Sequence, residues 1–478
     1  MIALFFSAAP GRLLLAMPVL ASIVGLLLFG QNLLSTHSLI ILPSMLKTDI
    51  LITDIGLSDP SAEQKIIKNC CLAITGDTIS RIGPAAEFAD LEAEITINGQ
   101  NCLALPGLVN THCHGAMTLF RGLADDLELD RWLNKNIFPA EAAHVNPEMV
   151  YWCTKLAAAE MILSGTTTVA DGYFHENEAA RAFVDAGMRA VPAQSVIDFP
   201  TPDVPDPQNN IVAAEQFIDR WQHSNPLISP AIFAHSPYTC SNTTLQAAKR
   251  LAREKNVLLF IHVSETRSEP EMISHLQDKS PIKHLDSLGI LDPATICVHC
   301  VWVDEEDLDI LAERGAKVVI CPQSHLKLAS GMAPLQTMLK KHIQVGLGTD
   351  GPASNNSLDM FREMDVCAKV QKIRFLDPVA VPAARVLKMA TSGGAAVLGL
   401  EKKIGALVPG MKADIILVNR STPHLQPMYS SDLLVYSADG SDVQSVFING
   451  KPVLRDRQIL TFDLSETLHR VRDLAAGL

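Results

Sequence analysis

The sequence predicts an α/β protein, a (β/α)₈ TIM barrel with a small β-sandwich domain built from both ends of the chain. Apolar, strand-like runs alternate with helical patterns through the middle of the 478 residues, which is typical of parallel βαβ units. Eight such runs are present, which is the number that a closed barrel of this kind needs. Short β-rich runs with Gly and Pro turn signals precede and follow them.

The expected barrel strands share an apolar body and, in six of the eight, an end marked by His, Asp or a polar turn. Catalytic groups of this fold lie at the carboxyl ends of its strands, so these ends are the first functional signal. The expected strands span residues 104–114, 166–171, 189–197, 228–235, 257–262, 295–299, 317–321 and 344–350.

The chain is expected to divide into three parts. Residues 46–105 and 402–478 have the same β-rich texture and are expected to form the β-sandwich, and residues 106–401 the metal-dependent barrel. Residues 1–45 are an apolar extension, in which residues 13–30 carry no charge. A signal anchor, a membrane helix and a mis-assigned start before Met45 all stay open, and membrane contact is expected only if this segment is retained.

Composition and charge exclude several classes of protein. The net charge of −13 and the absence of a basic run argue against a nucleic-acid partner. Ten scattered cysteines favour a reducing compartment, so the catalytic domain is expected in the cytoplasm, and a homo-oligomer stays open. Cys297 and Cys300 have the spacing of half a zinc ribbon, but packed thiols in a buried strand are the preferred interpretation.

Two imidazoles, His112 and His114, stand at positions i and i+2 on the end of an apolar strand and therefore share a face. His262 and Asp350 end two other apolar strands. Three imidazole nitrogens and one carboxylate suit a catalytic divalent cation, Zn²⁺ or Fe²⁺, which lowers the pKa of a bound water toward ~7. A histidine pair alone is a weak signal, and the other two residues strengthen it.

Several segments together resemble the amidohydrolase superfamily, and within it the 5-methylthioadenosine/S-adenosylhomocysteine deaminases and their chlorohydrolase relatives. The resemblance runs from about residue 46 to the end. The segments that carry it are PGLVNTHCH, LFRGLADDLELDRWL, FPAEAA, SGTTTVAD, AHSPYTCS, HVSET, VHCVW, CPQSHLKLASG and GLGTDGPASNNSLDMFREM.

The resemblance implies a set of catalytic roles. His112, His114, His262 and Asp350 would bind one divalent metal ion. Glu265 would protonate the purine ring nitrogen, and Asp350 would also take the proton of the attacking water.

The resemblance also implies residues that contact the substrate. His299 resembles a histidine that moves protons near the new oxygen, with a core histidine as its alternative. Glu141 resembles a carboxylate that accepts the ribose hydroxyls, with a helix-start acid as its alternative. His235 resembles a histidine that touches the nucleoside, with a structural histidine as its alternative. Trp132 is expected either near the base or on an apolar helix face.

Two positions depart from the family pattern. Gln194 is expected where members that bind the homocysteine carboxylate carry an arginine, and an amide cannot form that bidentate ion pair. This favours methylthioadenosine or adenosine over S-adenosylhomocysteine. His325 stands where the family usually has asparagine. The fourth strand has no lysine that could bridge two metals, which favours a single ion.

The expected reaction is hydrolytic deamination of an adenine nucleoside to its inosine analogue with release of ammonia. The same machinery acting on guanine, another aminated heterocycle or a chloro-triazine is the nearest alternative, because fold resemblance does not fix a substrate. A non-catalytic barrel scaffold is the alternative of a different class. It is disfavoured because all four expected ligands and Glu265 are present.

Overall fold

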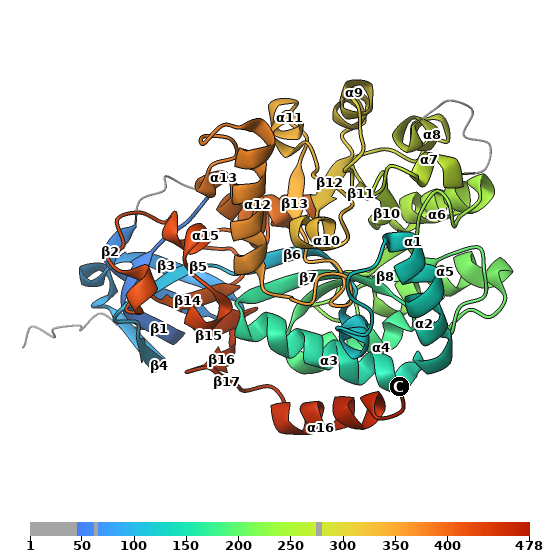
Figure 1. Cartoon of the computed structure of the whole chain (residues 1–478). Helices are drawn as coiled ribbons and strands as arrows, with labels where there is room; N and C mark the ends of the chain where they lie inside the picture. The colour runs from blue at the N-terminus through green and yellow to red at the C-terminus, as the bar shows by residue number, and fades with distance from the viewer. Residues whose placement is uncertain (1–44, 62–65, 274–279) are drawn as a thin grey trace, which may run out of the picture. The chain divides into compact units, whose positions relative to one another are not determined.

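The computed structural model describes residues 45–61, 66–273 and 280–478, and these residues form two sheets. One is an eight-stranded parallel sheet curled into a barrel, and the other is a nine-stranded mixed sheet (Figure 1). The predicted (β/α)₈ barrel is therefore confirmed. The apolar extension of residues 1–44 lies outside the described residues. Within the described ranges, no helix combines the length and the apolar character needed to cross a bilayer.

The barrel strands follow one another in chain order around the sheet, each parallel to its neighbours. They are β6 (Leu108–Cys113), β7 (Thr166–Tyr173), β8 (Arg189–Val196), β9 (Ala231–Ala234), β10 (Leu259–Val263), β11 (Thr295–His299), β12 (Lys317–Ile320) and β13 (Val345–Leu347). Helices connect them on the outside, among them α3 (Pro147–Leu163), α4 (Glu176–Ala186), α5 (Asn210–Trp221), α6 (Asn242–Lys255), α8 (Pro281–Ser287), α9 (Glu305–Arg314), α11 (Leu335–Lys340) and α12 (Met360–Phe375).

Several of these helices start at a polar side chain that caps the first turn. The side chains of Asn146, Ser241, Ser280 and Asp304 each accept the backbone N–H three residues later, at 2.8–3.2 Å. Such a cap satisfies one of the unpaired amides at a helix start and contributes about 1 kcal/mol. Helix starts are thus fixed by local chemistry, and this sets where each strand-to-helix loop ends.

The barrel closes between β13 and β6 through individual hydrogen bonds. Thr111 Oγ1 donates to the carbonyl of Leu347 at 2.8 Å, and the N–H of Asp350 donates to the carbonyl of His112 at 3.1 Å. Gly348 permits this approach, because a Cβ there would lie 2.8 Å from the Cβ of His112. The seam between the first and last strands therefore carries two of the expected metal ligands.

The first expected strand, 104–114, is in fact two strands. β5 (Cys102–Pro106) pairs with the mixed sheet, and β6 begins at Leu108 in the barrel. Gly107 separates them where the chain passes against Thr167, whose Oγ1 would lie 2.1 Å from a Cβ at this position. The apolar run is continuous because both strands are buried, so the sequence could not show the break.

Strands from the two ends of the chain pair with each other in the mixed sheet. β14 (Ile415–Asn419) runs antiparallel to β5, with Ile415 opposite Pro106. The small domain is one branched mixed sheet in which β1 pairs with β2, β4 and β5. Its other strands are β1 (Leu46–Leu57), β2 (Ile67–Thr75), β3 (Thr78–Pro84), β4 (Leu91–Asn98), β15 (Val443–Ile448), β16 (Lys451–Arg455) and β17 (Gln458–Ile459).

A buried ion pair links the two sheets. Arg189 at the start of β8 donates to both carboxylate oxygens of Asp414, at 2.7 and 3.0 Å. The two side chains are 5% and 1% exposed. Asp414 also accepts the N–H of Asn449 at 2.7 Å, so its charge is fully partnered.

Candidate active site

A cavity opens at the carboxyl ends of the barrel strands, and it collects most of the residues singled out in the sequence. Its lining includes, from the predicted set, His114, Trp132, Glu141, His235, His262, Glu265, His299 and Asp350. Its remaining walls are mainly apolar and aromatic, with Phe138, Tyr173 and Phe233 among them. An apolar cavity with a few convergent polar groups is the usual form of a small-molecule site.

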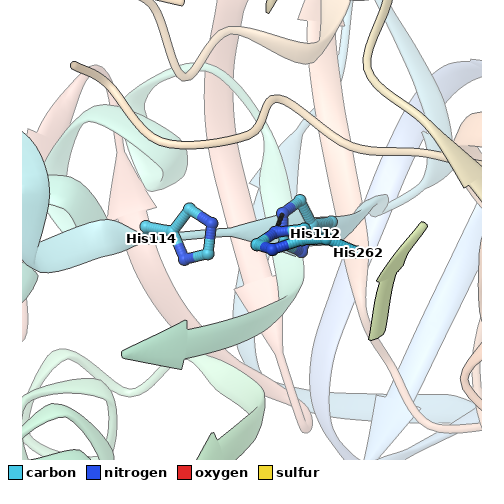
Figure 2. A group of neighbouring side chains, drawn as sticks. All are labelled: His112, His114 and His262. Carbon is cyan, nitrogen blue, oxygen red and sulfur yellow. Dashed lines mark hydrogen bonds between the residues drawn. The ribbon is translucent and has the colours of Figure 1, made fainter. Parts of the chain in front are cut away.

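Three histidines, His112, His114 and His262, lie close together (Figure 2), and the last two line this cavity. His112 lies on β6, His114 directly follows it, and His262 lies on β10. One ring nitrogen of each lies within 4.8 Å of those of the other two, and the Nε2 atoms of His112 and His262 are 3.3 Å apart. Burial lowers the pKa of His112 to about 4 and holds the pKa of His262 well below its usual range, so both rings are neutral.

Asp350 adds a carboxylate to the cluster. Its Oδ1 lies 3.5 Å from the Nε2 atoms of both His112 and His114. Its Oδ2 accepts a hydrogen bond from Ser324 Oγ at 2.6 Å. Burial acts to raise the pKa of Asp350, but the hydrogen bond and charge of the neighbouring imidazoles outweigh it and hold that pKa well below the usual value.

The hydrogen bonds of this group fit a bound cation. His114 Nδ1 donates a short hydrogen bond to the carbonyl of Gly172, which fixes the proton on Nδ1 and leaves the Nε2 lone pair facing Asp350. Neutral imidazoles and an ionised carboxylate are the forms that bind metals. The residues present therefore fit a divalent metal ion.

Glu265 stands beside the cluster on a turn that the side chain of Glu269 holds in place. Glu269 accepts the N–H of Ser264 and the N–H of Glu265, each at 2.8 Å. Ser330 Oγ lies 3.4 Å from Glu265 Oε1. Burial, and next the charge of Asp350, raise the pKa of Glu265 to about 8, so the carboxyl group holds a proton at neutral pH.

His299 ends β11 and connects the site to a second histidine behind it. Its Nε2 lies 3.5 Å from Glu265 Oε2, and its Nδ1 shares a 3.0 Å hydrogen bond with Nε2 of His325. Both rings are 2% exposed. Burial lowers the pKa of His299 to about 4, so this ring is neutral at physiological pH.

Three non-glycine residues at the strand ends have a left-handed backbone. The φ angles are 55° at Ser264, 80° at His299 and 63° at Asp350. Such conformations cost roughly 1–3 kcal/mol each and concentrate at functional sites, where the surrounding structure holds them. Here they lie directly after β10, at the end of β11 and shortly after β13, at or next to the cavity-lining residues Glu265, His299 and Asp350.

Glu141 also lines the cavity, and it lies on α2 (Phe138–His144). Tyr173 Oη donates to its Oε1 at 2.6 Å, which leaves Oε2 free to accept from a ligand. Burial raises the pKa of Glu141 to about 7, and the hydrogen bond from Tyr173 acts in the opposite direction. Trp132 lines the same cavity and is 5% exposed.

His235 directly follows β9, and its ring centroid lies 5.1 Å from that of His262 at an interplanar angle of 85°. Its Nδ1 shares a 2.9 Å hydrogen bond with Thr239 Oγ1. Burial lowers its pKa to about 3, so the ring is neutral. The ring lines the cavity, with Nε2 as the nitrogen left for a ligand.

Gln194, like His112, is not among the residues that line the cavity. Its side chain donates to Asp203 Oδ2 at 2.8 Å, whereas its neighbour Ser195 lines the cavity. Successive residues of a strand point to opposite faces, so a shift of one position exchanges inside and outside. Ser195, rather than Gln194, is therefore the residue of β8 that lines the cavity.

The supporting residues were not predicted from the sequence. Some unpredicted residues contact predicted ones from other parts of the chain: Tyr173 contacts Glu141, Ser324 contacts Asp350 and Ser330 contacts Glu265. Glu269 contacts the backbone of Glu265 within the same turn. Only Glu269 had a local signal, since it follows Glu265 by four residues at the start of the short helix α7 (Glu269–Met272). The thiols of Cys297 and Cys300 are buried and free, as the packed-thiol interpretation expects.

The strand ends of this (β/α)₈ barrel bring together three imidazoles and a carboxylate that suit a divalent cation, and a glutamic acid lies beside them. This arrangement defines the class of metal-dependent barrel hydrolases. Residues 103–453 match the model of the amidohydrolase family. The chain therefore belongs to the amidohydrolase family.

Similar proteins cover nearly the whole described chain. The 5-methylthioadenosine/S-adenosylhomocysteine deaminase 1 of Syntrophus aciditrophicus is 47% identical over 411 residues, which are 86% of this chain and 93% of the relative. The 5'-deoxyadenosine deaminase of Methanothermobacter thermautotrophicus is 41% identical over 81% of this chain and 90% of its own length. A zinc-bound adenosine deaminase structure from Xanthomonas campestris, 34% identical, superposes with a TM-score of 0.88 and covers 90% of this chain and 98% of its own.

Proposed function

We propose that this protein catalyses the hydrolytic deamination of an adenine nucleoside, 5'-methylthioadenosine foremost, to the inosine analogue and ammonia. One observation carries the proposal. Two histidines of the cluster, His114 and His262, line one cavity together with Asp350 and two further buried acids, Glu265 and Glu141. Together they supply groups for both ends of a nucleoside.

His112, His114, His262 and Asp350 are the proposed ligands of one zinc ion. Three nitrogen donors and one oxygen donor suit Zn²⁺, and the similar adenosine deaminase was solved with zinc. When bound, the ion lowers the pKa of a coordinated water toward ~7.

Glu265 is the proposed proton donor to the purine. Because its pKa is raised to about 8, it holds a proton at neutral pH and delivers it to ring nitrogen N1 as water adds to C6. The proton makes the ring a better electrophile.

Asp350 and His299 complete the proton transfers. Asp350 is ionised, accepts a proton from the attacking water and passes it to the amino group, which leaves as ammonia. The remaining hydroxyl proton returns to Glu265 as the C6–O bond becomes a carbonyl. His299 lies 3.5 Å from Glu265 and faces the same region, where a neutral imidazole can hydrogen-bond the new oxygen.

Glu141 and His235 are the proposed contacts for the rest of the nucleoside. Glu141 Oε2 accepts the ribose hydroxyls, because Tyr173 already occupies Oε1. His235 lines the same cavity and offers Nε2 to the nucleoside, since Thr239 shares a hydrogen bond with its Nδ1.

The residues that line the cavity favour a nucleoside whose 5' substituent is apolar or small. Among the described residues that line the cavity and the adjoining hollow beside Phe199 and Met272, no lysine or arginine is present. A carboxylate such as that of homocysteine would lose water there without gaining an ion pair, which is costly. We therefore favour methylthioadenosine, 5'-deoxyadenosine and adenosine over S-adenosylhomocysteine.

The decisive experiment is an ammonia-release assay with purified, zinc-loaded protein. The panel contains methylthioadenosine, adenosine, S-adenosylhomocysteine, guanine and a chloro-triazine. Methylthioadenosine is expected to have the highest kcat/KM. Faster turnover of guanine or the triazine would replace the nucleoside proposal, and no turnover of any compound would favour a scaffold.

Glu265→Gln is the matched variant for this assay. It is expected to bind the metal normally and to lose at least about 10²-fold in kcat, because the amide has no proton of suitable acidity to donate. Rates like those of the unmodified protein would remove Glu265 from the mechanism.

A further inference from the structure

A small pocket lies next to His325, which contacts the active-site histidine His299. Most of its walls are apolar, and the two side chains with hydrogen-bonding groups among them are His325 and Gln371 of α12. The volume open to the centre of a water molecule is about 10 Å³. This is close to the minimum that holds one water, provided that polar groups line it.

The hydrogen bonds of Gln371 leave one buried acceptor. Its Nε2 donates to the carbonyl of Ala333 at 3.1 Å, and since a carbonyl only accepts, this bond fixes which end of the amide is nitrogen. The remaining atom, Oε1, is buried and has no hydrogen-bond partner among the described residues. A buried acceptor of this kind normally has a partner, often an ordered water.

The hydrogen bond between His299 and His325 limits which ring nitrogens can carry protons. Nδ1 of His299 and Nε2 of His325 are 3.0 Å apart, so one of them donates and the other accepts. On the far side of His299, Nε2 lies 3.5 Å from a carboxyl oxygen of Glu265. A protonated Glu265 keeps one carboxyl oxygen as an acceptor. With Oε2 in that role it accepts from a proton on Nε2 of His299, which leaves Nδ1 of His299 to accept from His325.

We propose that His325 is a positioning residue that fixes the tautomer of His299, with one buried water bridging His325 Nδ1 and Gln371 Oε1. The water donates one O–H to each of these atoms. His325 then carries its proton on Nε2 and donates it to Nδ1 of His299. His299 consequently presents an N–H to the active site, which is the group that hydrogen-bonds the new oxygen in the proposed function on which this inference rests.

The proposal concerns a residue in which this chain departs from the pattern it resembles. A histidine has two ring nitrogens on opposite sides, so it can contact His299 and the small space at the same time. An asparagine at position 325 would be shorter and would end in a single amide.

The tautomer is measured directly by nitrogen NMR on the full, zinc-loaded chain labelled with ¹⁵N-histidine. The signal of His299 is identified by its loss in His299→Gln. A neutral ring protonated on Nε2 is expected, and His325→Leu is expected to lose this single form. Protonation on Nδ1, or an unchanged signal in His325→Leu, would overturn the proposal.

Kinetics separate positioning from packing. His325→Leu is expected to lower kcat about 10–100-fold with little change in KM, as loss of an outer hydrogen bond does at metal sites. His325→Gln retains an N–H donor near the same place and is expected to recover most of that loss. An equal loss in both variants would mean that the ring only fills space, and would contradict the proposal.

Gln371 supplies an independent test that leaves both histidines intact. Gln371→Leu removes the acceptor and is expected to shift His299 toward a mixture of tautomers, whereas Gln371→Glu keeps an acceptor and preserves the single form. A high-resolution crystal structure should show one water within hydrogen-bond distance of both His325 and Gln371, and an empty space there would refute the bridge. If the protein deaminates no nucleoside, the proposed function fails, while the NMR result still decides the tautomer.

Discussion

Glu269 accepts the backbone N–H of Glu265 at 2.8 Å, and its other carboxyl oxygen accepts the N–H of Ser264. Burial raises the pKa of Glu269 to about 8, although both of these hydrogen bonds act to lower it. The turn that presents the proposed acid therefore depends on a side chain that lines only the adjoining hollow.

Glu269→Ala should reduce kcat about 10–100-fold, because two backbone amides lose their acceptor and the turn relaxes. Glu269→Gln keeps one acceptor and should lose less. Metal content, measured by elemental analysis, should stay at that of the unmodified protein, since no proposed ligand is touched. If Glu269→Ala retained full activity, the turn would be held by other contacts.

His262→Ala should lose bound metal and activity together, because one of four ligands disappears and leaves a partly open site. His223→Ala is the control, since His223 lies on the surface far along the chain from the cluster and should keep both properties. Metal content and ammonia release are measured on the same samples. An active, metal-free His262→Ala protein would contradict the ligand assignment.

The pH dependence of KM should depend on Glu141. Its pKa is raised to about 7, so the carboxylate that accepts the ribose hydroxyls is present above this pH and is lost as the pH falls below it. KM for a ribonucleoside should therefore rise between pH 7 and pH 6 and be flat above pH 8.

Two controls isolate this effect. Glu141→Gln cannot titrate, and its KM should be higher by about 10-fold and independent of pH over this range, because a charge-assisted hydrogen bond is replaced by a neutral one. A 2',3'-dideoxynucleoside should lack the dependence with the unmodified protein. A rise in KM at low pH that persists in Glu141→Gln would assign the titration to another group.

Arg189→Met should reduce the free energy of unfolding by about 3–5 kcal/mol, because it leaves the buried carboxylate of Asp414 without its partner. Arg189→Met with Asp414→Asn removes the charge but keeps an acceptor for Asn449, so it should recover part of the loss. Chemical denaturation of the three proteins measures this. Equal midpoints for all three would show that the ion pair contributes little to stability.

The fold and the metal cluster could be predicted because their signals are local. Each barrel strand is a short apolar run, and His112 and His114 share a face by the alternation of a strand alone. The same alternation explains why Ser195, and not the predicted Gln194, lines the cavity: adjacent residues of a strand face opposite sides, so an error of one position moves a side chain from inside to outside. Tyr173 and His325 act through contacts with Glu141 and His299, which are distant along the chain, and no pattern in one sequence records such contacts.

The seam between β13 and β6 is closed by individual hydrogen bonds, and His112 and Asp350 lie on its two sides. A cation bound by both residues would link the first and last strands of the barrel across this seam. Ligand binding to the folded state alone raises its stability with the logarithm of free ligand. We therefore expect removal of the metal to destabilise this seam first. Amide hydrogen exchange should become faster in β13 and β6 before it becomes faster in the other barrel strands.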